Sequence, residues 1–241
     1  MRALLLPIIA ALATGQMPDT KVARDGFYLY YRASGTGRAV AILSGGPGFD
    51  CDYMTPVANE VAKSNQAILV ELRGTGRSRP QVISRDTISL KGYIGDLEAL
   101  RAHLKLERWT VLGHSAGGLL TMHYAAAHPE RVDSLVLVGS APIAAEFMDG
   151  FMDNVAVRLS PEGRKALAAF SQPGGGAPSE EQFVAGLKLV LPGYFFDAAK
   201  AAALAAAFRS ESLHVDVNQL LSAEMMRPGA DLRPQLKVSV P

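Results

Sequence analysis

The sequence has almost no cysteine and almost no net charge. Its 241 residues contain one cysteine, Cys51, and 24 basic against 23 acidic residues. A single cysteine excludes an intramolecular disulfide, and a net charge of +1 gives no electrostatic reason to bind nucleic acid or an anionic membrane. No His-Glu-x-x-His motif, paired Cys/His spacing or dinucleotide fingerprint is present, so the sequence predicts no metal and no cofactor. Its composition, with 49% hydrophobic and 20% charged residues, is typical of an ordinary globular protein.

The sequence also has no hydrophobic run long enough to span a bilayer, which needs about 20 residues. The longest N-terminal apolar run, Ala3 to Ala13, follows Arg2 and ends near the small residues Ala13 and Gly15. A charged start, a short apolar run and small residues are typical of a secretory signal. Residues 1–15 are therefore predicted to be a signal peptide, and the protein to be secreted or periplasmic, with no integral membrane segment. The alternative is an uncleaved first segment of a cytosolic protein.

Hydrophobic patterning predicts that strands and helices alternate along residues 16–139. Two strands, 26–31 and 39–43, are predicted to open the fold as an antiparallel pair joined by the turn Ser34 to Gly37. Later strands are expected at 67–71, 109–112 and 132–138, separated by helices near 53–63, 90–106 and 118–127. Continuous apolar strands in this order favour a mostly parallel sheet with helices on both faces, the core of an α/β fold.

Residues 140–229 show helices and loops without a convincing strand. Helices are expected at Ala144 to Leu159, Pro161 to Phe170, Ser179 to Val190 and Ala198 to Arg209, with a Gly-Pro loop over Pro173 to Pro178. A single crossover between neighbouring strands is much shorter than this. An inserted helical cap is therefore preferred over additional helices that simply cover the sheet.

The most informative motif is Gly113-His114-Ser115-Ala116-Gly117, which lies between a predicted strand and a predicted helix. In that context G-x-S-x-G predicts a nucleophile elbow, a sharp turn that exposes the serine hydroxyl at the end of a sheet. Attack by Ser115 on a carbonyl would create an oxyanion, which backbone N–H groups must stabilise. One donor is predicted to be Ala116, the residue after the nucleophile. The other is predicted to be Gly46, in the loop after the strand that ends at Leu43.

Three motifs in order resemble the α/β-hydrolase fold family, most closely its proline iminopeptidase-like branch. They are Ser44-Gly45-Gly46-Pro47-Gly48, Glu71-Leu72-Arg73-Gly74-Thr75-Gly76-Arg77-Ser78 and Gly113-His114-Ser115-Ala116-Gly117-Gly118. Ser44 stands where the family usually has His, and Glu71 where it usually has Asp. The resemblance covers roughly residues 20–241. It implies a serine peptidase or esterase with a helical cap. From its residue type, Arg73 is expected to organise the loops and not to be catalytic, the alternative being a contact with substrate.

The resemblance also implies that the chain is truncated before the seventh strand of the fold. Residues 230–241 resemble the lead-in to that strand, and in this family the catalytic acid and histidine come after it. Of five histidines only His214 lies late in the sequence; the others are His103, His114, His123 and His128. A makeshift triad of His214 with Asp197 or Asp216 is disfavoured, because the cap is not where the fold places its base. The strand 132–138 would then be an exposed apolar edge.

Three hypotheses follow for what the protein does. The first is a secreted serine hydrolase acting through Ser115 and an acyl-enzyme, represented by a fragment or an interrupted reading frame and therefore weakly active or inactive. The second is a truncated, non-catalytic homologue that binds a ligand or partner. The third is an enzyme with an unorthodox base or one completed by a second chain.

The substrate is expected to be a small peptide, as the resemblance implies for an aminopeptidase, or alternatively an ester. In the family a cap carboxylate holds the substrate's free amine, and the available residues are Glu146, Glu162, Glu180, Glu181, Glu211 and Glu224. Cys51 follows the predicted oxyanion loop but has no histidine placed to activate it, so it is expected to be a packed or exposed free thiol.

Overall fold

The computed structural model describes residues 19–170 and 178–236, and its centre is a single six-stranded sheet. The strands are β1 (Asp19–Arg24), β2 (Phe27–Ser34), β3 (Ala39–Leu43), β4 (Gln66–Val70), β5 (Trp109–His114) and β6 (Val132–Val138). Their order is β1-β2-β4-β3-β5-β6, with β3, β4, β5 and β6 parallel and β1 and β2 antiparallel to their neighbours. The prediction of a mostly parallel sheet is confirmed. The predicted signal peptide, 1–15, lies outside the described residues.

The predicted pairing of the two opening strands is wrong. β2 pairs with β1 and β4, and β3 pairs with β4 and β5, so the two never meet. The hairpin is instead β1–β2, turned at Gly26 with φ +79°, a conformation that glycine adopts readily. Gly35, in the predicted turn, has φ +76°, and an added Cβ there would lie 2.2 Å from the Asn65 carbonyl oxygen. The segment Ser34 to Gly37 is therefore a connection that passes close to the loop before β4.

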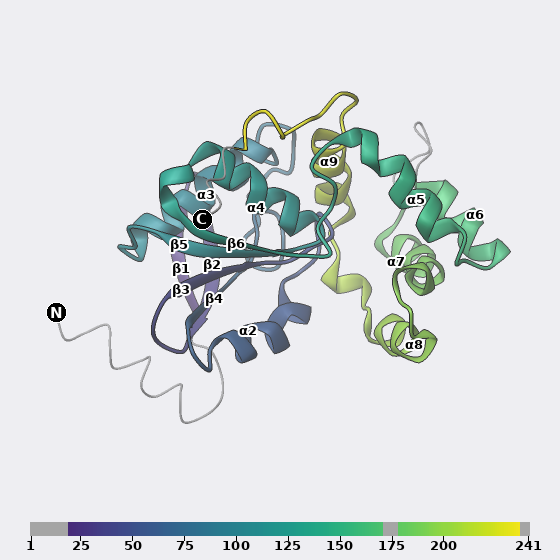
Figure 1. Ribbon diagram of the computed structural model, residues 1–241, viewed down its shortest axis with the longest axis horizontal. Coiled ribbons are helices and arrows are strands. Elements are labelled where there is room, and N and C mark those ends of the chain that lie inside the picture. Colours follow the sequence, from purple (N-terminus) through teal and green to yellow (C-terminus); the bar gives the residue numbers. More distant parts are fainter. Residues whose placement is uncertain (1–18, 171–177, 237–241) are drawn as a thin grey trace.

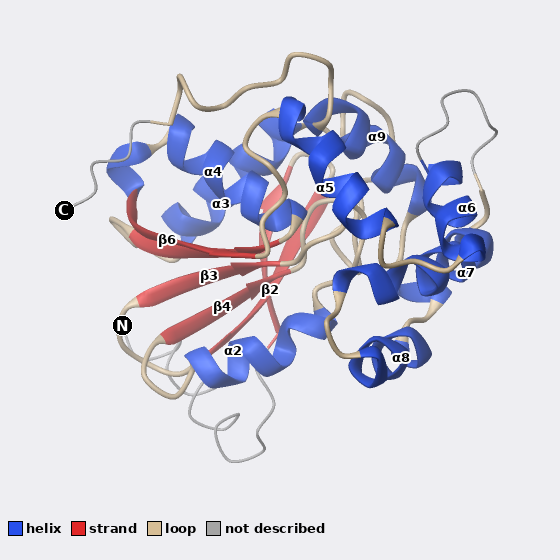
Figure 2. Cartoon of the chain, turned by 45° about the vertical axis from the view of Figure 1, so that its right-hand side comes forward, coloured by secondary structure: helices blue, strands red, loops and turns tan. Residues whose placement is uncertain are grey.

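Helices cover both faces of the sheet, as predicted. The helices of the core are α2 (Thr55–Val61), α3 (Leu90–His103) and α4 (Ala116–Ala127). Figure 2 shows α3 and α4 on one face and α2 on the other. Ser89 caps α3, because its hydroxyl accepts the Gly92 N–H at 3.3 Å.

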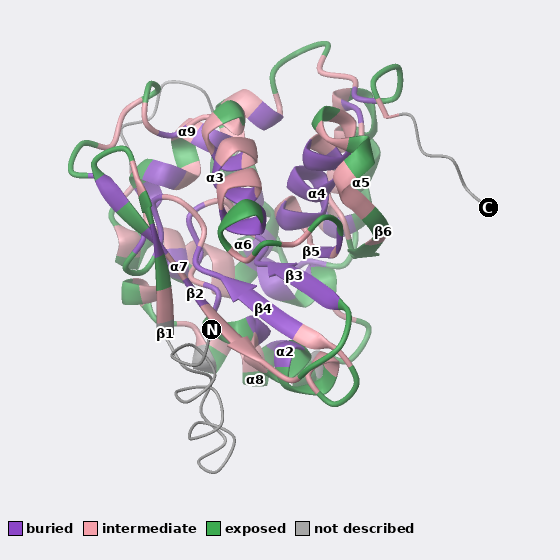
Figure 3. Ribbon diagram, turned by 90° about the vertical axis from the view of Figure 1, so that its left-hand side faces the viewer, coloured by how far each residue is buried: buried purple, intermediate pink, exposed green. Residues whose placement is uncertain are grey.

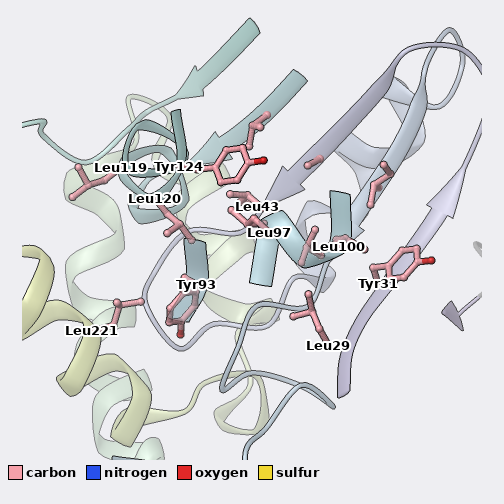
Figure 4. Packing of buried hydrophobic residues seen from close by; sticks show 14 of the residues in the cluster. Leu29, Tyr31, Leu43, Tyr93, Leu97, Leu100, Leu119, Leu120, Tyr124 and Leu221 are labelled. Atoms are coloured by element: carbon pink, nitrogen blue, oxygen red, sulfur yellow. The ribbon is translucent and has the colours of Figure 1, made fainter. Parts of the chain in front are cut away.

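The main core lies between the sheet and the α3–α4 layer. Leu29, Leu43 and Leu100 are fully buried there, and α9 adds Leu221 to the same cluster. Figure 4 shows how these side chains lie. A smaller cluster lies under α2, where Ile42, Leu69 and Met54 pack together. These two layers fix the ends of β3 and β5, where the predicted site residues lie.

A helical segment follows β6. Its helices are α5 (Met148–Ala156), α6 (Pro161–Phe170), α7 (Glu180–Val190), α8 (Ala198–Ala207) and α9 (Val215–Met225). Figure 1 shows α5 to α8 gathered beside the sheet, with α9 between them and the core. The first predicted helix is shorter than expected, because the segment before Met148 forms a single 3-10 turn, Ala145–Phe147. The predicted loop over 173–178 lies almost wholly outside the described residues.

β6 forms one edge of the sheet within the described residues, and its second half is exposed. Val136, Leu137 and Val138 are 40%, 44% and 44% exposed among the residues that the structure describes. Figure 3 shows the contrast with the buried inner strands β3 and β4. Unpaired backbone groups beside apolar side chains favour pairing with another strand.

Candidate active site

Ser115 occupies a strained turn between β5 and α4. Its backbone has φ 53° and ψ −120°, and among described non-glycine residues only Lys105 also has a positive φ. The turn is held from both sides: Ser115 N–H donates to the Val138 carbonyl at 3.0 Å, and the Ser115 carbonyl accepts from Ala141 N–H at 2.9 Å. A non-glycine residue whose backbone is held at positive φ by its surroundings is typical of a functional position. This is the geometry that the G-x-S-x-G motif predicts.

The glycines of the motif allow the backbones to approach closely. A Cβ added to Gly113 would lie 2.3 Å from the Gly117 carbonyl oxygen, and one added to Gly117 would lie 2.4 Å from that of Ser44. No side chain fits at such distances without movement of the backbone. The start of α4 therefore packs directly against β5 and against the end of β3.

The predicted oxyanion loop lies against the nucleophile. A Cβ added to Gly45 would be 2.7 Å from the Ser115 Cβ, so these two backbones are in direct contact. Gly46 has φ +59°, and its carbonyl accepts the Phe49 N–H at 2.8 Å, which closes a tight turn around Pro47. The loop thereby brings Gly46 to the side of the elbow.

Gly46 and Ala116, the two predicted donors, line the same small cavity. Neither N–H donates to another group within the described parts of the chain. Ala116 is the first residue of α4, where N–H groups have no partner inside the helix and the helix dipole favours negative charge. The arrangement can therefore offer two backbone donors to a developing oxyanion.

The cavity beside these donors is small. Leu221 and Met225 of α9 also line it, and it leaves about 10 Å³ for the centre of a water molecule. That is about the room one water needs, and it is too little for the acyl group of a substrate.

The late histidine does not form the makeshift triad considered for it. His214 Nε2 lies 3.3 Å from Oδ1 of Asp50. Asp216 instead pairs with Arg79 at 2.9 Å, and Asp197 caps α8. Sequence reasoning missed Asp50 as the partner because 164 residues separate the two side chains.

The other histidines also have different surroundings. His114 Nδ1 lies 2.8 Å from the Tyr53 hydroxyl, and burial lowers the pKa of His114. His103 stacks edge-on to Tyr31. Burial likewise lowers the pKa of His123, and His128 lies against Tyr124. In residues 19–170 and 178–236 no hydrogen bond joins a histidine to the Ser115 hydroxyl.

Arg73 has the structural role that was predicted for it. Its guanidinium forms two hydrogen bonds with Asp96, at 2.8 and 2.6 Å, and a third with the Thr87 carbonyl at 3.2 Å. It also lies over the ring of Phe27, 4.6 Å from the centroid. All these partners belong to the scaffold, so Arg73 ties the loop after β4 to α3.

The two substitutions within the motifs keep structural partners. Ser44 is buried and donates to the Phe49 carbonyl at 3.3 Å, across the base of the oxyanion loop. Glu71 is also buried and accepts the Arg77 N–H at 2.9 Å. Neither replacement removes a group that would react with substrate.

Cys51 is a packed thiol. It is 1% exposed, and burial raises its pKa to about 12 although Arg32 donates to its sulfur at 3.2 Å. The thiol therefore stays protonated at neutral pH and is a poor nucleophile.

At least three of the candidate amine-binding carboxylates are already engaged. Glu146 pairs with Arg233 at 2.8 Å, Glu224 accepts the Leu90 N–H at 2.8 Å, and Glu181 accepts the Ser179 hydroxyl at 2.8 Å. Among the described residues no group of acidic, cysteine and histidine side chains is arranged to hold a metal ion. The described helices include none that is long and apolar enough to cross a membrane.

The comparisons of this chain with known proteins agree on one family. Residues 38–189 match the model of the family described as "alpha/beta hydrolase fold". A probable proline iminopeptidase of Streptomyces coelicolor is 37% identical over 128 residues, covering 48% of this chain and 38% of the relative. A proline iminopeptidase of Xylella fastidiosa is 35% identical over 140 residues, covering 57% and 44%. The chain thus spans less than half the length of these curated relatives.

Solved structures share the fold at lower identity. The proline iminopeptidase of Mycobacterium smegmatis superposes with a TM-score of 0.61 at 18% identity, covering 84% of this chain and 70% of that one. The N-acyl homoserine lactonase AidH, solved with N-butanoyl homoserine, gives a TM-score of 0.64 at 18% identity, covering 93% and 76%. At these identities the similarity establishes the fold alone.

Proposed function

The chain belongs to the α/β-hydrolase fold family, and from this premise we propose that it is a serine hydrolase whose nucleophile is Ser115. The observation that carries the proposal is the contact of the Gly45–Gly46 loop with the strained Ser115 turn. In this arrangement Oγ of Ser115 attacks a carbonyl carbon, and the N–H groups of Gly46 and Ala116 bind the oxyanion that forms. Collapse of that intermediate expels the leaving group and leaves an acyl-enzyme.

We propose a peptide substrate, with the protein acting as an aminopeptidase of the proline iminopeptidase type. The similarity to two curated proline iminopeptidases at 35–37% identity supports this substrate class. Cleavage of an amide requires a general acid to protonate the departing amine, and none of the described histidines forms a hydrogen bond with the Ser115 hydroxyl. The 241-residue chain is therefore proposed to turn over weakly.

The lack, among the described residues, of a histidine hydrogen-bonded to the Ser115 hydroxyl favours a second candidate, a carboxylesterase-type hydrolase. An activated ester releases a leaving group that needs no protonation, so it can react where an amide cannot.

We also propose that the protein is exported, because residues 1–15 have the pattern of a signal peptide.

Acyl transfer to Ser115 is expected to be slow but specific. After incubation with p-nitrophenyl acetate and an acid quench, peptide mass spectrometry should find acetyl on the peptide that carries Ser115. The proton of Oγ passes to water, and p-nitrophenolate leaves. Because hydrolysis of the acyl-enzyme also needs a base, the acetyl group should persist rather than turn over.

The control for this experiment is Ser115→Ala, which should lose that acetyl group and keep any surface acetylation. Acetylation confined to surface lysines in both proteins would contradict the assignment of Ser115 and favour a non-catalytic homologue.

A further inference from the structure

The hydroxyl of Tyr53 joins the predicted oxyanion loop to the nucleophile elbow. Tyr53 lies in the 3-10 turn Asp52–Met54 before α2, and its oxygen accepts the Gly45 N–H at 2.5 Å. The same oxygen lies 2.8 Å from Nδ1 of His114, the last residue of β5 and the neighbour of Ser115. One hydroxyl therefore contacts both segments on which the site depends.

One of these two hydrogen bonds has a fixed direction: the Gly45 N–H can only donate, so the Tyr53 oxygen accepts from it. The Tyr53 hydroxyl keeps its own proton to donate to Nδ1 of His114. That bond requires the tautomer in which His114 has a lone pair at Nδ1 and its proton on Nε2. Burial agrees with this state, because it lowers the pKa of His114 and raises that of Tyr53 to about 12, which keeps both groups neutral at pH 7.

The packing around this contact leaves the loop little freedom. A Cβ added to Gly45 would lie 2.6 Å from the His114 carbonyl, 2.8 Å from its Nδ1 and 2.7 Å from the Ser115 Cβ. The rings of Tyr53 and His114 meet edge to face, with centroids 5.6 Å apart at 71°. Any shift of Gly45 relative to the elbow must therefore break the hydrogen bond to Tyr53. The next residue, Gly46, carries one of the two proposed oxyanion donors.

We propose that Tyr53 and His114 are positioning residues that hold the oxyanion loop in register with Ser115, so that the Gly46 N–H points at the reacting carbonyl. The proposal rests on the proposed function of Ser115. It assigns a role to His114, which fills a variable position of the G-x-S-x-G motif, and to Tyr53, which no sequence motif singles out.

The test is the rate of Ser115 acetylation by p-nitrophenyl acetate in four variants. Tyr53→Phe keeps the ring and removes the bridging oxygen, and it should lower the rate about tenfold, less than the 10²–10³ of a lost oxyanion donor. The ester concentration at half-maximal rate should stay the same, because the hydroxyl holds the loop and does not bind substrate. Tyr28→Phe is the matched control, since that ring is 48% exposed on β2, and it should acetylate at the wild-type rate.

Replacement of His114 separates positioning from simple packing. His114→Asn places an acceptor oxygen near the position of Nδ1 and should retain most of the rate, whereas His114→Leu offers no acceptor and should fall as far as Tyr53→Phe. Equal loss in both His114 variants would overturn the proposal, as would an unchanged rate in Tyr53→Phe.

A nuclear magnetic resonance measurement tests the contact independently of any reaction at Ser115. The ¹⁵N shifts of His114 at pH 7 should show Nδ1 as the unprotonated nitrogen, and the Nδ1 signal should move in Tyr53→Phe. A proton on Nδ1 in the wild-type protein would overturn the network even if Ser115 is acetylated. Conversely, the expected shifts together with no acetylation would leave the network standing and contradict only the proposed function.

Discussion

Replacing Asp96 with alanine is expected to destabilise the protein by about 3–5 kcal/mol, the usual result of removing one partner from a buried ion pair. The Asp96 carboxylate is 3% exposed and accepts from Arg24 on β1 at 2.6 Å and from Arg73 at 2.6 and 2.8 Å. It thereby links β1, the loop after β4 and α3. The alanine variant would leave two largely buried guanidinium groups without their carboxylate. Urea unfolding followed by circular dichroism measures the change.

The matched control for this change is an exposed ion pair in the same protein. Asp133 pairs with Arg108 at 2.7 Å, but both side chains are nearly half exposed. Asp133→Ala should therefore cost less than about 1 kcal/mol. If the two aspartate variants unfolded at similar urea concentrations, the ion pairs of Asp96 with Arg24 and Arg73 would not have the structural importance inferred for them.

Replacing Gly117 with alanine should destabilise the protein by about 1–3 kcal/mol, the usual cost of overpacking. The added Cβ would lie 2.4 Å from the Ser44 carbonyl oxygen and 2.8 Å from that of Leu43, and neither backbone group can rotate away. Helix α4 would have to move off β3, which also misplaces Ser115. The urea concentration at the midpoint of unfolding and the rate of Ser115 acetylation should therefore both fall.

Gly150, in α5, provides the control because a Cβ added there has no atom within 4 Å. Gly150→Ala should stabilise the protein by roughly 0.5–1 kcal/mol, since alanine loses less backbone entropy than glycine in a helix. The two substitutions are chemically identical and should have opposite signs. Destabilisation of similar size at both positions would contradict the close contact at the elbow as the cause, because a Cβ at Gly150 meets no such contact.

The parts of the site that depend on local backbone geometry were predictable from sequence. The glycines around Ser115 predicted a sharp strand–turn–helix, and the structure has Ser115 at φ 53° between β5 and α4. The motif before Pro47 predicted a loop at the end of β3, and that loop packs on the elbow. In each case a glycine is required by a contact within a few residues or by a motif whose structural context is known.

Contacts between distant segments were not predictable in this way. The Tyr53–His114 contact spans 61 residues, and the His214–Asp50 contact spans 164. No periodicity or spacing indicates either pair. The pairing of the opening strands failed for a related reason. A glycine-containing turn was interpreted as a hairpin, whereas β4, reached only after α2, inserts between β2 and β3. Strand β1 was missed because its alternating charged residues resemble a loop.

The central claim is that the nucleophile and the oxyanion half of a serine hydrolase site are formed in this chain, while its described histidines leave Ser115 unactivated. The most direct test is the rate of Ser115 modification by a fluorophosphonate probe in the purified 241-residue protein, measured beside His214→Gln. Glutamine can still donate to Asp50 but is no general base. The account predicts slow modification of Ser115 at nearly equal rates in both proteins. Rapid, stoichiometric modification that His214→Gln slows by about 10²–10⁴, the range of general-base catalysis, would contradict it.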